Sequence, residues 1–324
     1  MQVRRIREVG MERGSGLRTS RRDLLLGGLC LCCLPRAGFA AEAAGVQEIQ
    51  PGVFVRRGLD VDAAPGNADA IANIGFVIGK DAVLVTDSGG SLADGKWLRD
   101  QIRQKTDRPI RHVVLSHVHP DHSFGACAFV DDRPDFIGHA RLKPALEARG
   151  AFYKDKLSEV LGAGNVGPVV MPTREIGPEG GEVDLGDRKF AFQAHRTAHT
   201  DCDLSMMDLS SGLLFPADLL FVKRVPSLDG SLLGWLKELD GLEALGAKTI
   251  VPGHGPVTVD QKAFGDLRRY LTVLRDQTRK AIKDGKSIDE AIQTVGASEK
   301  DNWALFSDYN SRNATQAYKE LEWE

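Results

Sequence analysis

Four side chains of the kinds that bind metal ions stand within six consecutive residues: His117, His119, Asp121 and His122. Imidazole nitrogens and carboxylate oxygens are the ligands that zinc takes in open catalytic sites. Side chains alternate along an extended chain, so the two histidines of the His-Val-His pair point to the same side. The proline that follows turns the chain, and we expect Asp121 and His122 to face a second metal ion. The run therefore predicts a centre of two metal ions.

Such a centre needs further ligands, and three candidates stand at the ends of predicted strands. His199 lies just beyond the predicted strand 190–195, and Asp218 follows the apolar run 213–216. His254 lies in a Pro-Gly-His-Gly-Pro turn, whose glycines allow close approach of the backbone. Loops at strand ends converge on one edge of a sheet and often carry ligand sites there.

The other histidines are weaker candidates for metal binding. His195, four residues before His199, is the alternative ligand at that position, although the run 190–195 predicts that it still lies in a strand. His112 and His139 are expected to be core or surface residues. Cys202, three residues after His199, is near enough in sequence to approach the site, but a structural thiol is the simpler prediction.

Composition and charge restrict the classes of partner. The 324-residue chain has 42% hydrophobic and 27% charged residues, which is enough apolar material for a sizeable core. Its formal net charge of −3 provides no basic field that would attract nucleic acid or an anionic membrane. We therefore expect a small-molecule substrate and no nucleic-acid partner.

The N-terminal segment has the order of an export signal. An arginine-rich stretch, 1–22, precedes an apolar stretch, 24–34, and small residues around Ala40. The pair Arg21-Arg22 is typical of a twin-arginine signal. We therefore predict export by the twin-arginine (Tat) translocase, cleavage near Ala40 and a location in the periplasm. The apolar stretch is shorter than the ~20 residues that span a bilayer, so no stable membrane insertion is expected after cleavage.

Three of the five cysteines would leave with this signal. The remaining two, Cys127 and Cys202, can either pair in an oxidising periplasm or stay as buried thiols. Two cysteines in a chain of this length do not make a disulfide framework.

Short β-branched runs alternate with longer helical patterns, which indicates strands and helices layered together. We assign 1–40 to the signal peptide and 41–324, including C-terminal helices, to a single domain. Residues 150–185, rich in glycine and proline, are predicted to form a long loop. Strands are predicted at 53–55, 74–78, 82–86, 112–116, 190–195, 204–208, 212–216 and 249–251, and helices at 91–105, 231–245 and 260–295.

The order His-x-His-x-Asp-His, a distant histidine, an aspartate after a short strand and a Gly-His-Gly turn resembles the metallo-β-lactamase superfamily. The resemblance runs from Val46 to past His254 and includes an Asp-Ser-Gly turn that begins at Asp87. It implies an α+β fold, the four-layer αββα sandwich, with the metal ions at one edge. It also implies that Asp218 bridges both metals. In the family, the first metal would be held by His117, His119 and His199, and the second by Asp121, His122 and His254.

The resemblance further implies a zinc-dependent hydrolase with two Zn²⁺ ions, in which a metal-bridging hydroxide attacks the carbonyl of an ester, thioester or amide. Asp121 is the predicted catalytic residue, which orients the hydroxide or takes its proton. Asp218 stands where the antibiotic-destroying members have a bridging cysteine. The basic residues with which glyoxalase II binds glutathione have no match here. The layout is most similar to the periplasmic zinc metallohydrolases associated with quinoprotein relay and sulfur-oxidation systems.

Two other functions remain open at this stage. Some members of the superfamily bind a single iron ion and oxidise persulfides, so a mononuclear iron enzyme is one alternative. A non-enzymatic periplasmic protein that binds a metal or cofactor as an accessory is the other. Metal analysis separates iron from zinc, and hydrolysis of reporter substrates separates an enzyme from a binding protein.

Overall fold

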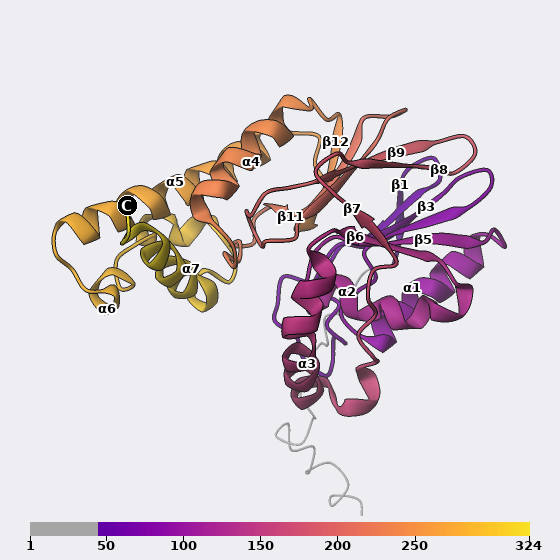
Figure 1. Ribbon diagram of the computed structural model, residues 1–324, viewed down its shortest axis with the longest axis horizontal. Coiled ribbons are helices and arrows are strands. Elements are labelled where there is room, and N and C mark those ends of the chain that lie inside the picture. The colour runs from indigo at the N-terminus through magenta and orange to yellow at the C-terminus, as the bar shows by residue number, and fades with distance from the viewer. Residues whose placement is uncertain (1–44) are drawn as a thin grey trace, which may run out of the picture. The chain divides into compact units, whose positions relative to one another are not determined.

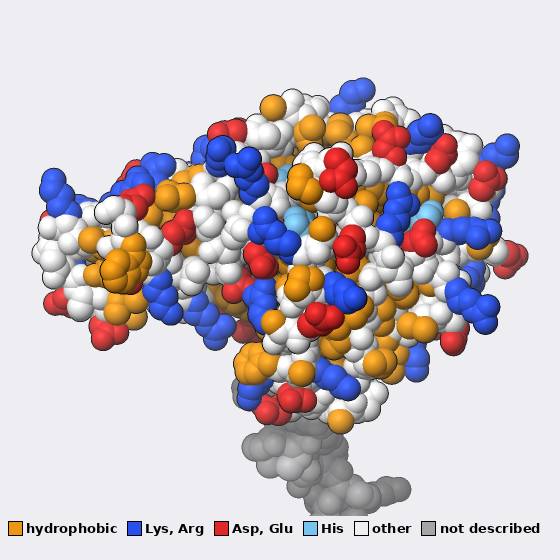
Figure 2. All heavy atoms as spheres, in the orientation of Figure 1, with side chains coloured by type: hydrophobic (Ala, Val, Ile, Leu, Met, Phe, Trp, Pro, Cys, Tyr) orange, Lys and Arg blue, Asp and Glu red, His pale blue; other side chains and the backbone are white. Residues whose placement is uncertain are grey.

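Two β-sheets form the centre of the protein in the computed structural model, which describes residues 45–324. The predicted signal peptide, 1–40, lies outside the described residues and stays a prediction. None of the helices within residues 45–324 combines the length and the apolar character that crossing a bilayer requires. On the face drawn in Figure 2, acidic and basic side chains are interspersed, as the small net charge leads one to expect.

The first sheet has its seven strands in sequence order. Neighbours from β1 to β4 are antiparallel, whereas β4 to β7 run parallel to one another. Parallel strands place their carboxyl ends at one edge of a sheet, so the residues that follow β4 and β5 come together there. The strands are β1 (Gln47–Gln50), β2 (Val53–Arg56), β3 (Ile74–Ile78), β4 (Val83–Thr86), β5 (Ile110–Leu115), β6 (Asp135–His139) and β7 (Arg174–Ile176).

The second sheet has five strands in the order β12-β11-β10-β9-β8. The pair β11–β12 is parallel, and the remaining neighbours are antiparallel. The parallel pair brings the last residues of β12 beside the last residues of β11. The strands are β8 (Gly181–Asp184), β9 (Lys189–Ala194), β10 (Leu204–Asp208), β11 (Leu213–Phe221) and β12 (Thr249–His254).

Helices cover the outer face of each sheet, as Figure 1 shows for α1 and α3 on one side and α4 and α5 on the other. The α-helices are α1 (Leu92–Lys105), α2 (Pro120–Ser123), α3 (Leu142–Leu161), α4 (Leu232–Ala244), α5 (Lys262–Lys283), α6 (Ile288–Ala291) and α7 (Phe306–Leu321). Short 3₁₀ segments lie at Phe124–Asp132, Ala163–Asn165 and Ala297–Asn302. α7 packs with α4 and α5 in the same apolar cluster.

The sequence of β4 shows why both faces of a sheet are buried. Val83 and Val85 point into the cluster that contains Leu98 of α1, whereas Leu84 points into the cluster shared with Phe190 of the second sheet. This alternation with period two lets one strand contribute to two layers of core. The resulting order of helices, sheet, sheet and helices confirms the predicted αββα sandwich.

The predicted long loop at 150–185 is wrong over its first part. α3 continues to Leu161, because Leu157 and Leu161 keep the apolar face that begins at Leu146. Gly150 is buried inside this helix, where a Cβ would meet the Val169 side chain at 3.3 Å. Glycine therefore serves close packing there, and composition alone did not distinguish that use from a loop. β7 and β8 also lie within the segment.

Two other element boundaries differ from the sequence prediction. Asp218 lies inside β11 rather than after it, because the strand continues to Phe221 through a register shift around Ala217, whose φ is +48°. The predicted helix at 260–295 is interrupted: α5 ends at Lys283, and Gly285 has a φ of +71° before α6 begins.

Candidate metal centre

The end of β5 carries the first histidine of the site. β5 lies between β4 and β6 as a parallel strand, and His117 follows it directly. Asp87, which follows β4, accepts hydrogen bonds from the Ser116 backbone N–H and from the Ser116 hydroxyl, both at 2.8 Å. Because Asp87 ties the two strand ends together, the orientation of His117 is fixed by the sheet.

A single helical turn then presents the next ligands. His119 precedes Pro120 and has an extended backbone with φ −69° and ψ 143°, as a residue before proline prefers. Pro120 occupies the first position of α2, where its missing N–H costs nothing. The turn of α2 carries Asp121 and His122 back beside His117. As predicted, His117 and His119 follow the strand as one pair, and Asp121 and His122 lie on the following turn as a second pair.

The second sheet supplies Asp218 and His254 from its parallel pair. His254 is the last residue of β12 and pairs with Phe221 of β11. Asp218 is held close to Gly253, where an added Cβ would collide with the Asp218 carboxylate. Glycine is thus required at position 253 for the carboxylate to reach the site.

His199 comes from the loop between β9 and β10. The turn is closed by Asp203, whose carboxylate accepts from the Thr200 backbone N–H and hydroxyl. The imidazole packs against the rings of Trp235, at 5.2 Å between centroids, and Phe221, at 5.7 Å. These contacts leave His199 with no exposed surface and aim its Nε2 at the other ligands.

The seven predicted site residues come together in two groups whose ligand atoms lie within 4.8 Å of one another inside each group. Asp218 stands between the groups. Its Oδ2 lies 3.4 Å from His199 Nε2 and 3.5 Å from His254 Nε2, and its Oδ1 lies 3.0 Å from His122 Nε2. The groups are His117, His119, His199 and Asp218, and Asp121, His122 and His254.

Each histidine turns one ring nitrogen to the centre and bonds the other to a fixed partner. The Nδ1 atoms of His199 and His254 donate to the carbonyl oxygens of Ser227, at 2.6 Å, and Ile71, at 2.9 Å. A carbonyl only accepts, so these imidazoles carry hydrogen on Nδ1 and keep Nε2 for a metal ion. This arrangement is the outer shell that orients ligands in metal sites.

The three other histidines follow the same rule. His122 Nδ1 bonds Asp87 Oδ2 at 2.8 Å, and His117 Nδ1 bonds the Ser116 hydroxyl at 3.0 Å. His119 is reversed: its Nε2 bonds Asp229 Oδ2 at 3.1 Å, so its Nδ1 faces the centre. Asp87 and Asp229 are therefore outer partners of the site, and only Asp87 had a signal in the sequence.

The donor set fits a pair of metal ions. Two buried atoms at its middle, His122 Nε2 and Asp218 Oδ1, lie 3.0 Å apart without the angles of a hydrogen bond, and neither has another partner among the described residues. Buried polar atoms in folded proteins are nearly always satisfied, and unpaired ones call for a missing partner. Nitrogen and carboxylate donors that converge in this way suit zinc and related divalent ions.

The two groups of candidate ligands differ in the direction in which their histidine pKa values are shifted. Burial lowers the pKa of His117 well below its usual value, and the neighbouring His122 adds to this effect. Burial acts in the same direction on His122, but the carboxylates of Asp218 and Asp121 outweigh it and hold the pKa of His122 well above its usual value. Conversely, burial raises the pKa of Asp121, yet His122 and His254 outweigh it and lower that pKa.

The remaining histidines lie away from the centre. His195, the alternative to His199, has both ring nitrogens occupied: Nδ1 bonds Glu238 at 2.9 Å and Nε2 bonds Ser205 at 2.7 Å. His139 bonds the carbonyl oxygen of His195, and His112 lies beside Asp135. Neither histidine belongs to the two groups of candidate ligands.

Both cysteines within the described residues are free thiols. Cys202 is fully buried, and burial raises its pKa to about 12, so it is not a thiolate that would bind metal.

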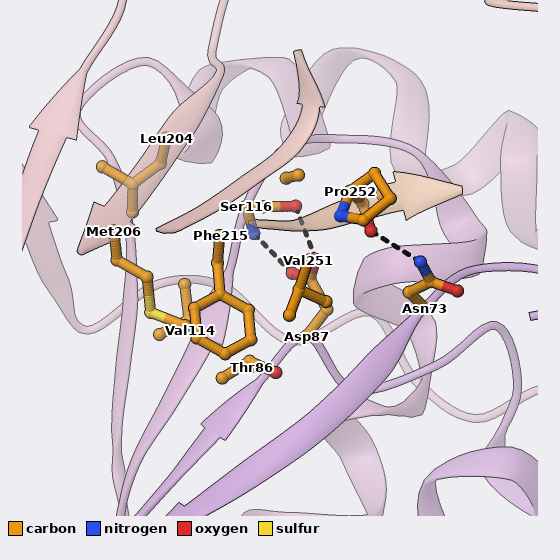
Figure 3. Close-up of a pocket in the computed structure, with 12 residues that line it drawn as sticks. Asn73, Thr86, Asp87, Val114, Ser116, Leu204, Met206, Phe215, Val251 and Pro252 are labelled. Atoms are coloured by element: carbon orange, nitrogen blue, oxygen red, sulfur yellow. Dashed lines mark hydrogen bonds between the residues drawn. The ribbon is translucent and has the colours of Figure 1, made fainter. Parts of the chain in front are cut away.

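A small cavity lies behind the ligands, between the sheets. Figure 3 shows Asp87, Ser116 and Asn73 as its polar wall and Met206 and Phe215 as part of its apolar wall. Its volume of about 20 Å³ accommodates one water molecule and no substrate. A different pocket, of about 300 Å³, has Asp121, Asp218 and His254 in its wall and is large enough for a small molecule.

That pocket also has residues that the sequence did not single out. They come from the segment after β11 and from α7: Arg224, Tyr309 and Arg312. No local motif marks them, because they reach the site only through the packing of α7 against the second sheet.

Comparison with known proteins decides the family. The model of the metallo-beta-lactamase superfamily matches residues 68–254, which include all seven site residues. The chain belongs to the metallo-β-lactamase superfamily. The matched region ends at His254, so α7 lies outside it.

Relatives within the superfamily have different substrates. The linear primary-alkylsulfatase of Pseudomonas sp. (strain ATCC 19151) is 23% identical over 257 residues, which cover 66% of this chain and 48% of the relative. The chain therefore spans about half the length of that relative. Similar solved structures include the sec-alkylsulfatase Pisa1 from Pseudomonas sp., with a TM-score of 0.67 and 16% identity over 86% of this chain and 50% of Pisa1. A metallo-β-lactamase from Pontibacter korlensis has a TM-score of 0.58 and 16% identity over 70% of this chain and 98% of its own.

Asp229 gives a first testable prediction about the outer partners. Its carboxylate bonds His119 and forms an ion pair with Arg149, so it fixes the most exposed of the five histidines. We expect Asp229→Asn to lower zinc affinity by roughly 10- to 100-fold, because an amide cannot hold the imidazole in the same way. Competition with a chromophoric chelator measures this. Asp201→Asn, which removes the other partner of Arg149, is the matched control, and equal affinities for both variants would refute the assignment.

Proposed function

We propose that the protein is a hydrolase that holds two zinc ions in the two groups of ligands and cleaves esters or thioesters at the carbonyl. The observation that carries the proposal is Asp218, whose two oxygens face histidines of both groups. A carboxylate in that position is suited to bridge two ions. When bound, the zinc ions would supply a water molecule of lowered pKa and polarise the oxygen that is attacked.

The chain's own residues have separate tasks in this reaction. Asp121 remains ionised because His122 and His254 lower its pKa. Its Oδ2 lies 3.2 Å from His254 Nε2, which leaves Oδ1 to accept a proton from the attacking water. The buried rings of Phe221 and Trp235 keep solvent from the far side of His199.

A second candidate is hydrolysis of sulfate esters. The similarity to the linear primary-alkylsulfatase over 66% of this chain favours it. Water would attack either the sulfur, which releases the alcohol, or the carbon that bears the ester oxygen, which releases sulfate. Metal ions held by the same ligands would stabilise the oxygen that leaves. Asp218, in place of a cysteine, speaks against a β-lactamase, as the resemblance to the wider family implies.

We further infer a periplasmic location, reached by twin-arginine export. The proposal rests on the arginine pair and apolar stretch within residues 1–40. An intact-mass measurement of the protein recovered from the periplasm tests it, because cleavage near Ala40 predicts loss of the first 40 residues.

The function is tested with zinc-reconstituted protein and four chromogenic reporters: a thioester, 4-nitrophenyl acetate, a cephalosporin and 4-nitrophenyl sulfate. We expect turnover of the thioester or the ester, and its loss in Asp121→Asn when activity is expressed per bound zinc. Turnover of the sulfate alone would favour the second candidate. Protein that carries two zinc ions and cleaves none of the reporters would support a non-enzymatic role, and one bound iron with persulfide oxidation would replace the proposal.

A further inference from the structure

Two arginines line the pocket that opens onto the metal centre, and both lie close to one aromatic ring. The guanidinium carbons of Arg224 and Arg312 lie 5.9 Å and 5.6 Å from the centre of the Tyr309 ring. Both arginines share the pocket wall with Asp121 and Asp218. Arg312 also lines an adjoining pocket of about 410 Å³, which includes His119. The positive groups therefore stand at the entrance to the reacting centre.

Arg224 is unusual because it is buried without an ion pair. Only 4% of it is exposed, and its contacts are the Leu59 carbonyl oxygen at 3.4 Å and His254 Nδ1 at 3.2 Å. No carboxylate within the part of the chain that the structure describes forms a salt bridge with it. Burying an unpaired charge is costly, so an anionic ligand would relieve the cost when it binds.

Arg312 provides a charge that is accessible. It is exposed on α7, and its guanidinium forms no salt bridge with, and donates no hydrogen bond to, another residue of 45–324. The Tyr309 hydroxyl, by contrast, donates to Asp62, which holds the ring in place beside the two arginines. Three acidic groups near these arginines have other partners: Asp62 accepts from Tyr309, and Asp121 and Asp218 lie against the metal ligands. The buried carboxyl of Asp69 interacts with Arg224 through its charge but forms no salt bridge with it.

We propose that Arg224, Tyr309 and Arg312 form an anion subsite, so that the preferred substrate carries a negatively charged group beside the bond that is cleaved. This inference rests on the proposed function for the reaction itself. Arg224 lies within residues 68–254 that the family model matches, whereas Tyr309 and Arg312 lie beyond them on α7. The C-terminal helix of this chain therefore completes the subsite. The anion is either a carboxylate next to an ester or the sulfate group of a sulfate ester.

A matched pair of substrates tests the subsite in the zinc-loaded full-length protein. We expect the 4-nitrophenyl monoester of succinic acid, which is anionic, to have a higher kcat/KM than neutral 4-nitrophenyl acetate. In Arg312→Gln the ratio of the two values should fall roughly tenfold or more, mainly through KM, because a charge-assisted contact is lost. Arg312→Lys should restore part of the ratio. Arg279→Gln, on α5 and paired with Glu324, is the control that should leave the ratio unchanged.

Direct binding separates failure of the subsite from failure of the proposed function. Calorimetry with N-(4-nitrophenyl)succinamic acid, the amide analogue of the anionic ester, should show affinity that Arg312→Gln weakens by a similar factor. That result supports the subsite even if none of the esters is cleaved. A lack of ester cleavage would overturn only the proposed function. A parallel assay with 4-nitrophenyl sulfate identifies the source of the charge, and loss of its turnover in Arg312→Gln supports the subsite too. Equal ratios and equal affinities in Arg312→Gln and the wild-type protein would overturn the subsite.

Discussion

Asp218→Asn is expected to cause the largest loss of function of any single substitution in this protein. Within residues 45–324 Asp218 is the only carboxylate placed against histidines of both metal-binding groups, with the Nε2 atoms of His122, His199 and His254 between 3.0 and 3.5 Å from its oxygens. An amide keeps the size but removes the charge that two cations would share. Hydrolysis and zinc content should both fall, by more than the ~10- to 100-fold that loss of an outer partner costs.

The measurement combines steady-state rates with zinc per chain from elemental analysis, at matched protein concentration. His195→Gln is the control, because His195 is as buried as the ligands but bonds Glu238 and Ser205 instead. Thermal unfolding of the metal-free proteins shows whether Asp218→Asn still folds. A folded variant that retains two zinc ions and full activity would refute the bridging role.

Zinc binding near neutral pH should release protons, which is the second large expected effect. Burial lowers the pKa of His122 and His254, but carboxylates outweigh it, Asp218 foremost, and hold both pKa values above their usual range. Burial instead lowers the pKa of His199, as it does for His117. In the metal-free protein His122 and His254 therefore bind protons more tightly than His117 and His199 do, and a zinc ion must compete with those protons.

Calorimetric titration in buffers of different ionisation enthalpy gives the number of protons released. Raised histidine pKa values also set the sign of the pH effect on the metal-free protein. The stabilisation from protonated His122 is complete below the unfolded value near 6.5 and is lost as the pH rises through the folded value. Metal-free protein should thus lose stability in the alkaline range while zinc binding becomes stronger. A binding enthalpy that is the same in every buffer would contradict the assignment.

The candidate ligand positions could be predicted from the sequence because most of them lie near the end of a strand. Three histidines and an aspartate within 117–122 are a pattern that few functions other than metal binding require. His199 and His254 each stand beside turn residues that end an apolar run. Asp218 was found although its strand was misjudged, since the register shift around Ala217 depends on pairing with β12. Local sequence indicates that a strand exists, but its length depends on its neighbours.

The outer partners and the pocket wall were not accessible in this way. Asp229 and Arg149 are 80 residues apart, and Asp62 and Tyr309 are 247 apart, so only the packed chain brings them together. Gly150 shows a related difficulty, because the sequence alone does not distinguish a glycine that packs inside a helix from a glycine in a loop. The physical reason is that packing between layers, rather than periodicity along the chain, determines these contacts.

The central claim is that seven residues hold two metal ions, and zinc per folded chain tests it most directly. Elemental analysis of the reconstituted protein, with hydrolysis followed as zinc is added, gives both quantities in one titration. We predict two zinc ions per chain and activity that rises until the second ion is bound. Saturation at one metal ion per chain, or only trace metal in a folded protein, would contradict the account.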